Sequence, residues 1–255
     1  MMKRRIASAA LALCLVLALL PVHVQAADII KSGTCGTGVN WSLDSDGVLK
    51  ISGTGAMRSY SKTFTGTSSQ TTAPWGSDTK TITSIRVEDG VTSIGDYAFY
   101  VCFKATSVDI ADSVTSIGEN AFYGCRALTA VTIPESVTTI GKSAFSNCRA
   151  LTAVTIPKSV TRLSESVFNS CSSLTTVTIP GNVAYIGRDA FLCCSSLTTI
   201  TILEGVTEIG EQAFYSCYNV KKIYLPKTVD TIYRNAFGFK AGNKKDRRQP
   251  NWRNR

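Results

Sequence analysis

The stretch that decides the fold is VTSIGENAFYGCRALTAVTIPES, residues 114–136, because the chain repeats it with few changes. Residues 137–159 read VTTIGKSAFSNCRALTAVTIPKS, and residues 160–182 read VTRLSESVFNSCSSLTTVTIPGN. Seven in-register copies of this 23-residue unit run from Ile82 to Phe237. A fixed period of this size predicts a solenoid, in which each unit buries its apolar face only by stacking on its neighbours. A solenoid offers a broad surface rather than a deep pocket, so the repeat favours binding over catalysis.

One half of each unit predicts a short β-strand. Leu128, Val131 and Ile133 follow the pattern L-x-x-V-x-I, and Pro134 ends the run. Thr, Val and Ile favour strands, and their spacing turns the three apolar side chains inward. Equivalent runs begin at Ile82, Ala105, Leu151, Leu174, Leu197 and Val220. The pattern therefore predicts seven parallel strands, one in each rung.

The other half of each unit predicts a tight turn and a short helical or 3-10 return to the sheet. Its apolar positions in one rung are Val114, Ile117, Ala121, Phe122 and Cys125. Gly118 lies where the chain changes direction, and we expect a positive φ to explain the glycine. Ser164 and Tyr233 occupy that position in two other rungs, so another backbone geometry must also be tolerated there.

Phenylalanines recur every 23 residues and should form the spine of the core. They are Phe99, Phe122, Phe145, Phe168, Phe191, Phe214 and Phe237. Truncating a buried Phe to Ala typically costs about 3–5 kcal/mol, so the role expected for this column is structural.

Cysteines recur with the same period, at Cys102, Cys125, Cys148, Cys171, Cys194 and Cys217, and Cys35 and Cys193 are additional. An oxidising compartment would permit disulfides. Equivalent side chains on neighbouring rungs run parallel, however, whereas a disulfide needs β-carbons about 3.8 Å apart that point together. Buried free thiols are favoured, with disulfides or a metal site as the alternatives.

The repeat closely resembles the leucine-rich repeat of the BspA-like bacterial and protozoan surface proteins. The resemblance lies in IG-x-x-AF-x-x-C followed by L-x-x-V-x-IP and covers about residues 82–237. The preceding block is similar to the family's N-terminal region in SGTCG (32–36), WSLDSDGVLKISGTGAM (41–57) and APW (73–75). The resemblance implies a leucine-rich-repeat solenoid over 82–239 with a concave strand face. It also implies adhesion to host proteins or other cells through protein–protein contacts.

Residues 27–81 are expected to form an N-terminal β cap followed by a loop. Two alternating runs flank the turn Asp44 to Gly47, which predicts a β-hairpin. Its role would be to cover the apolar open end of the first rung. Residues 58–78 are rich in Ser, Thr and Gly and indicate a loop. The two acids of the turn are too few for a calcium loop, so no metal is expected.

The first 26 residues have the features of a secretory signal peptide. Three basic residues at 3–5 precede an apolar run over 6–20, and cleavage would fall before Ala27. The predicted localisation is therefore secreted, extracellular or associated with the cell surface. No later segment is long and apolar enough to span a bilayer, so the mature chain should have no transmembrane segment.

The formal charge of +9 belongs to the two ends of the chain. Residues 240–255 carry seven basic residues and one acid, and the basic and acidic residues of 27–239 balance. No basic face remains from which to build a nucleic-acid site. The basic tail could hold an anionic wall polymer or membrane headgroups; the alternative is a disordered end.

Catalytic chemistry finds little support in the sequence. The only histidine, His23, lies in the predicted signal peptide, so the mature chain has no imidazole to act as a base or a metal ligand. A Gly-rich phosphate loop and a metal-binding cluster are also missing from the pattern. We therefore expect no enzyme, no catalytic residue and no cofactor.

The outward residues of the strands predict where a partner binds. The middle rungs present Ala and Thr, whereas the end rungs present Arg86, Asp109, Lys222 and Tyr224. Thr also suits any solvent-facing strand, which is the structural alternative. Charged and aromatic side chains commonly anchor interfaces, so these four form our hypothetical site for a protein or cell-surface ligand. A competing hypothesis is a structural spacer, or a truncated fragment of a modular surface protein, with no binding role.

Overall fold

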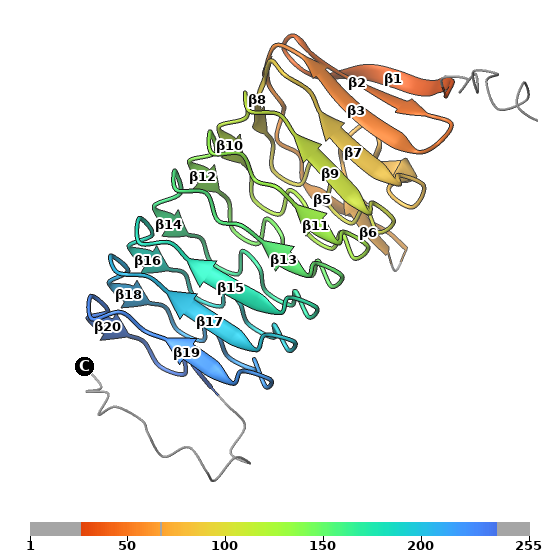
Figure 1. Cartoon of the computed structure of the whole chain (residues 1–255). Coiled ribbons are helices and arrows are strands. Elements are labelled where there is room, and N and C mark those ends of the chain that lie inside the picture. Colours follow the sequence, from red (N-terminus) through yellow and green to blue (C-terminus); the bar gives the residue numbers. More distant parts are fainter. Residues whose placement is uncertain (1–26, 67, 239–255) are drawn as a thin grey trace, which may run out of the picture.

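The structure, a computed structural model, describes residues 27–66 and 68–238. The predicted signal peptide and the basic tail lie outside these residues. Two columns of short parallel strands run the length of the molecule (Figure 1). The first column consists of β7 (Ser84–Val87), β9 (Ser107–Ile110), β11 (Ala130–Val131), β13 (Ala153–Val154), β15 (Thr176–Ile179), β17 (Thr199–Ile202) and β19 (Lys222–Tyr224). The second consists of β8 (Val91–Ile94), β10 (Ser116–Ile117), β12 (Thr139–Ile140), β14 (Arg162–Leu163), β16 (Tyr185–Ile186), β18 (Glu208–Ile209) and β20 (Thr231–Ile232).

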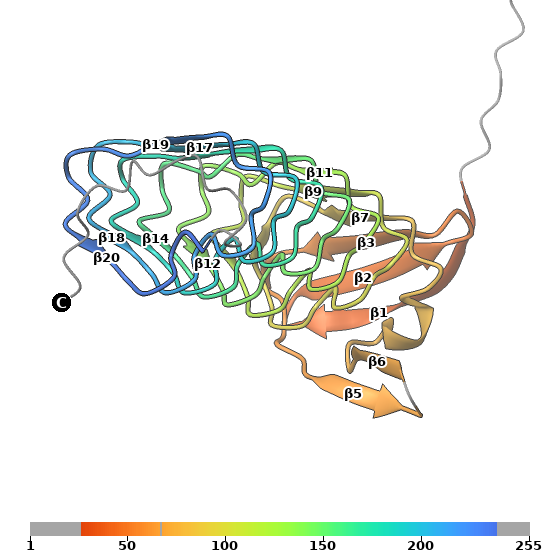
Figure 2. The ribbon, with the colours of Figure 1, turned by 90° about the horizontal axis from the view of Figure 1, so that it is seen from below.

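The register within both columns follows the 23-residue period. Arg86 lies opposite Asp109 in the first column, and Ser116 lies opposite Thr139 in the second. Seven strands in each column make about six complete turns from the first rung to the last. The solenoid fold class is therefore confirmed, and Figure 2 shows the successive rungs superimposed along the axis.

The return segment of each rung is not helical, unlike our expectation. A strand of the second column is followed by turns, in which alternate backbone N–H groups bond to the next rung. Phe99 N donates to Ala121 O at 2.7 Å, for example, whereas Cys102 N donates to Phe99 O in its own turn at 3.3 Å. A helix would direct every N–H along its own axis. In these turns, by contrast, about half of the N–H groups point to the next rung, and their hydrogen bonds hold neighbouring rungs together.

The glycine at the start of the return, present in five of the seven rungs, fits close packing between rungs, so our positive-φ prediction was wrong. Gly95, Gly118, Gly141, Gly187 and Gly210 are all absent from the residues with positive φ. A Cβ on Gly141 would lie 2.5 Å from the backbone nitrogen of Glu119 in the preceding rung. Positive φ occurs instead two residues after this position, for example 53° at Asn120. Asn tolerates that conformation better than most residues because its short polar side chain bonds locally.

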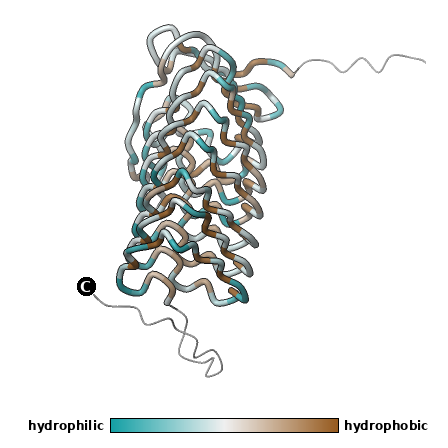
Figure 3. The backbone as a smooth tube through the Cα atoms, turned by 60° about the vertical axis from the view of Figure 1, so that its left-hand side comes forward, coloured by the Kyte–Doolittle hydropathy of each residue, from teal (hydrophilic) through white to brown (hydrophobic). Residues whose placement is uncertain are grey.

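The phenylalanine column is the spine of the core, as predicted. Phe99 to Phe214 are fully buried, and neighbouring rings stack with centroids 5.1–5.6 Å apart. Trp75 stacks on Phe99 and donates its indole N–H to Ala98 O at 2.8 Å, so the cap extends the column. Hydrophobic segments recur at the same place in successive rungs (Figure 3).

The N-terminal cap contains the expected hairpin and two elements that the sequence did not reveal. The hairpin is β2 (Val39–Asp44) paired with β3 (Val48–Gly53), and β3 continues in parallel onto β7. Asp44 shapes its turn by accepting the N–H groups of Asp46 and Val48. The unexpected β1 (Ile29–Gly36) pairs with β2, and the short β4 (Gly55–Ala56) pairs with β8. The cap thus lengthens both columns at the N-terminal end.

The segment 58–78 is not a simple loop. It contains the hairpin β5 (Lys62–Thr65) and β6 (Ser68–Thr71) and the 3-10 turn η2 (Gly76–Asp78). Figure 2 shows the hairpin lying away from the solenoid body. Within residues 27–66 and 68–238, no helix is long and apolar enough to cross a membrane.

The eight described cysteines are all free, and seven of them are buried. Each thiol of the repeat from Cys125 to Cys217 donates to a phenylalanine carbonyl of the preceding rung, as Cys125 Sγ does to Phe99 O at 3.4 Å. Burial raises the pKa of Cys125, Cys171 and Cys217 to about 12. The column is therefore a set of small, inert core residues.

A thiol-reactivity measurement checks this arrangement. In the native chain beginning at Ala27, we expect one fast-reacting thiol, Cys193, because it alone among the described cysteines is exposed. Seven further thiols should react only after denaturation, since a buried thiol is largely protonated and inaccessible. Cys193→Ser should remove the fast phase. Several fast thiols in the native variant would contradict the burial of the column.

Candidate functional site

The four predicted ligand residues form two separate pairs on the first column. Arg86 and Asp109 are both exposed and lie directly opposite each other on β7 and β9. Lys50 on β3 lies opposite Arg86 and makes an ion pair with Glu88 at 3.2 Å. This end of the face therefore carries an exposed, mixed-charge cluster of four side chains.

The second pair, Lys222 and Tyr224, lies on the last strand of the column. Both side chains are exposed, and Tyr224 is 53% accessible. They lie opposite Thr199 and Thr201 of β17. Five strand steps from β9 to β19 span about 24 Å at the usual strand spacing. The structure thus places all four residues on one face but does not bring them together.

A second face, which sequence reasoning missed, lies on the second column. The outward position of its strands is small in Ser93, Ser116 and Thr139 but large in the next three rungs, which carry Arg162, Tyr185 and Glu208. The Arg162 guanidinium lies 4.6 Å from the centre of the Tyr185 ring.

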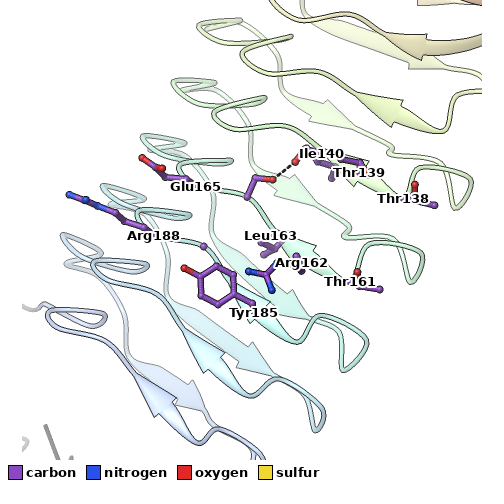
Figure 4. A pocket seen from close by; sticks show the side chains of 11 residues that line it. Thr138, Thr139, Ile140, Thr161, Arg162, Leu163, Glu165, Tyr185 and Arg188 are labelled. Carbon is purple, nitrogen blue, oxygen red and sulfur yellow. Dashed lines mark hydrogen bonds between the residues drawn. The ribbon is translucent and has the colours of Figure 1, made fainter. Parts of the chain in front are cut away.

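Beside the pair of Arg162 and Tyr185 is a hollow of about 460 Å³ (Figure 4). Its polar lining includes Thr138, Thr139, Thr161, Arg162, Glu165 and Arg188.

The hollow coincides with a break in the second column. Strands β8, β10 and β12 form one hydrogen-bonded sheet and β14, β16, β18 and β20 form another. Thr115 N donates to Thr92 O, and Thr138 N to Thr115 O, both at 2.9 Å. Within the described residues, no backbone bond joins β12 to β14 in the same way. The first column is also divided into separate sheets, but its rungs stay joined by backbone hydrogen bonds at the divisions. Thr129 N, for example, donates to Thr106 O at 3.3 Å.

Ser164 explains the break. It occupies the repeat's glycine position, where an added Cβ on Gly141 would lie 2.5 Å from the preceding rung. Its hydroxyl donates to Ile140 O, whereas Gly141 N donates to the equivalent carbonyl, Ile117 O, at 2.8 Å. The separation between neighbouring phenylalanine rings is also largest here, with the Phe145 and Phe168 centroids 5.6 Å apart. The sequence carried a signal of the break, because Ser164 departs from the glycine of the repeat. The effect of that serine on the sheet, however, could be recognised only from the distance between rungs.

A column of alternating charge borders the hollow. Lys142 and Glu165 pair at 3.0 Å, and Glu211 and Arg234 pair at 3.2 Å. These pairs are largely exposed, so each contributes at most about 1 kcal/mol. Arg188 pairs at 3.3 Å with Asp189 of its own rung.

Asp189 differs from these exposed groups because its Oδ1 atom is buried and has no hydrogen-bond partner. Burial raises the pKa of its carboxyl, and Arg188 only partly opposes that shift. No group of three or more His, Cys, Asp and Glu side chains in the described part of the chain is arranged to hold a metal.

Comparison with known proteins identifies the repeat. The family model for the BspA-type leucine-rich repeat region, with six copies, matches residues 77–192 and 115–241. No curated protein gives a significant match.

Solved structures that are similar to this chain come from several bacteria. A leucine-rich cell surface protein of Faecalibacterium prausnitzii is 22% identical over 83% of this chain and 86% of its own, with a TM-score of 0.41. The leucine-rich repeat protein TpLRR of T. pallidum is 22% identical over 78% and 85%, with a TM-score of 0.43. The pneumococcal vaccine antigen PcpA is 15% identical over 79% and 72%, with a TM-score of 0.40. Because the family model covers well over half of its length, this chain belongs to the BspA-type leucine-rich repeat family.

Proposed function

We propose that the chain is a secreted or cell-surface binding protein that mediates adhesion by protein–protein contacts through the face of the first strand column. Membership of the BspA-type family supports a role in protein interaction. The observation that carries the proposal is the arrangement of the exposed anchors in two pairs at opposite ends of this face.

The separation of the two pairs favours a macromolecular partner. A span of about 24 Å is larger than a small ligand. It fits within one side of a standard protein interface, which buries about 800 Å² per partner. Between the pairs, small side chains such as Ala130, Ala153 and Thr176 leave the surface low and regular. A protein surface could therefore lie across the middle and engage charged or aromatic anchors at both ends.

The test is a binding screen of the purified chain on arrays of host-matrix, mucin and bacterial-surface components. For the component bound, Arg86→Ala with Asp109→Ala should weaken binding about tenfold or more, and so should Lys222→Ala with Tyr224→Ala. Losing an anchor residue of an interface typically costs about 1–2 kcal/mol or more, and about 1.4 kcal/mol is tenfold. Combining all four changes should weaken binding further than either pair does.

Thr176→Ala with Thr178→Ala is the matched control, since these residues lie on the same face between the pairs. We expect this variant to bind nearly as well as the parent chain. Unchanged binding by the fourfold variant would show that the site lies elsewhere. Failure of the parent chain to bind any component would favour a structural spacer instead.

A further inference from the structure

The break between β12 and β14 creates a feature that the repeat does not need. In a repeat protein each rung is a control for the others, because all rungs satisfy the same packing requirements. The rung of residues 160–182 departs from its neighbours at Arg162, Leu163, Ser164 and Val167. Three of these residues, Arg162, Leu163 and Ser164, line the hollow. The hollow is therefore a property of this rung and not of the fold.

The opening is local to one side of the rung. On the turn side, Ser143 N still donates to Glu165 O and Phe145 N to Val167 O, both at 2.9 Å. The rungs therefore remain joined there while the second column is separated. A strand inserted between two others needs about 9.5 Å between them, whereas the stacked rings of these two rungs, Phe145 and Phe168, are only 5.6 Å apart. The break therefore cannot admit another strand. A ligand would have to lie over the opening from outside.

Ser164 produces the opening, and Tyr233 shows where the same change has no such effect. Tyr233 also replaces the repeat's glycine, yet its N–H still donates to Ile209 O at 2.9 Å. Tyr233 lies in the last described rung, where no described rung packs on its far side. Ser164 lies in the middle of the stack, where its rung is packed against a neighbour on each side and cannot shift away. Space for its Cβ must therefore come from separation of β12 and β14.

The chemistry at the opening suits an anion that carries hydroxyl groups. Glu165 is balanced by Lys142 and Arg188 by Asp189, whereas Arg162 makes no ion pair within the described residues. Thr161 N–H lacks the inter-rung bond that Thr138 N–H makes. A guanidinium and a free amide favour a carboxylate, because charge-assisted hydrogen bonds are the stronger ones. Threonine hydroxyls around them can bond to further hydroxyl groups of the ligand.

The hollow exposes little aliphatic surface to a ligand. Ile140 and Leu163 are each only 1% exposed, so the partly exposed Tyr185 ring is the main apolar group of the lining. Its volume of about 460 Å³ is within the range of small-ligand sites. We propose that this hollow is a binding site for a carboxylate-bearing sugar unit, with Arg162 engaging the carboxylate beside Tyr185. The site lies on the second column and does not depend on the interface proposed for the first.

Two acidic probes and one neutral probe test the site. We expect the purified chain to bind 3′-sialyllactose or a hyaluronan tetrasaccharide, as measured by ligand-observed NMR and calorimetry, and to bind lactose at least about tenfold more weakly. The sialic-acid probe represents a glycan terminus and the uronic-acid probe represents a polymer, so the two arms distinguish the sources. Equal binding of lactose, binding of neither acidic probe, or equally strong binding of acetate would overturn the proposal.

Three variants locate the binding. Arg162→Thr should weaken it about tenfold or more, since one charged hydrogen bond is lost. Ser164→Gly should restore the inter-rung bond, slow hydrogen exchange at the Thr161 amide and also weaken binding while Arg162 remains. Arg126→Ala is the matched control, because the Arg126 guanidinium also lies over an aromatic ring, 5.1 Å from the centre of Phe103, but does not line the hollow.

Binding that survives Arg162→Thr, or that falls equally in Arg126→Ala, would show that the hollow is not the site. If Ser164→Gly slows exchange at Thr161 but leaves binding intact, the opening itself has no role in recognition, which also overturns the proposal. Arg162 is exposed, and Ser164→Gly restores the glycine of the repeat, so both variants are expected to fold.

Discussion

Raising the pH from 8 to 10 should lower the free energy of unfolding by at least about 4 kcal/mol. Burial raises the pKa of Cys125, Cys171 and Cys217 from 9.0 to about 12. In the unfolded chain these thiols ionise near pH 9, whereas the folded chain keeps them protonated. Their contribution to stability is therefore complete below pH 9 and is lost as the pH rises toward 12. At pH 10 each such thiol costs roughly 1–2 kcal/mol.

The remaining buried thiols of the column act in the same direction. Burial raises the pKa of Cys102, Cys148 and Cys194 well above the ordinary value. A domain is typically stable by only about 5–15 kcal/mol, so the column makes the protein sensitive to mild alkali. Urea titrations followed by circular dichroism at pH 8 and pH 10 measure the effect.

Cys125→Ala with Cys171→Ala provides the control for this prediction. The difference in stability between the two pH values should shrink by about 3 kcal/mol, since two thiols no longer ionise on unfolding. Lysine and tyrosine titration is common to both chains and cancels in the comparison. An unchanged difference would show that the thiols are not protonated in the folded core.

Periodicity made most of the fold predictable from the sequence. Residues 23 apart must occupy the same place in successive rungs, so Phe122 and Phe145 had to stack once the repeat was recognised. The hairpin of the cap was equally visible, because Trp41, Leu43, Leu49 and Ile51 alternate around a turn with glycine. These features depend only on the order of apolar and polar residues along the chain.

The features that sequence reasoning missed depend on distances between rungs. A glycine is compatible with a positive φ and with a close contact, and only the 2.5 Å approach at Gly141 distinguishes the two. The hairpin of β5 and β6 buries little, and its one large apolar side chain, Phe64, is 68% exposed. Its sequence therefore needs no alternation of apolar and polar residues, and this is why the strands were not predicted. The return segment has a helical spacing of apolar residues, yet its alternate N–H groups bond to the next rung.

The candidate sites follow the same division. Arg86, Asp109, Lys222 and Tyr224 could be placed on one face from the alternation of each strand, and the structure puts them there. The hollow beside Arg162 could not be predicted in this way, because it results from the loss of an inter-rung backbone hydrogen bond at Ser164. Variation at an outward position changes what a face displays, whereas variation at the glycine position changes the shape of the face.

Phe145→Ala should destabilise the protein by about 3–5 kcal/mol. The ring is fully buried and stacks on Phe122 at 5.1 Å and on Phe168 at 5.6 Å, so its removal leaves a cavity bounded by two rungs. Truncations of this kind cost both the transfer free energy of the ring and the cavity. Chemical denaturation of the purified variant at neutral pH, compared with the parent chain, measures the loss.

Phe237→Ala is the matched variant at the end of the column and should cost about half as much. Phe237 is only partly buried and stacks on one ring, Phe214, at 5.3 Å. In a solenoid, stability is approximately the sum of the intrinsic terms of the rungs and the interfaces between neighbours. Phe145 contributes to two interfaces among the described rungs and Phe237 to one. Equal losses for the two variants would mean that the last rung is as tightly enclosed as the middle of the stack, which contradicts the partial burial of Phe237.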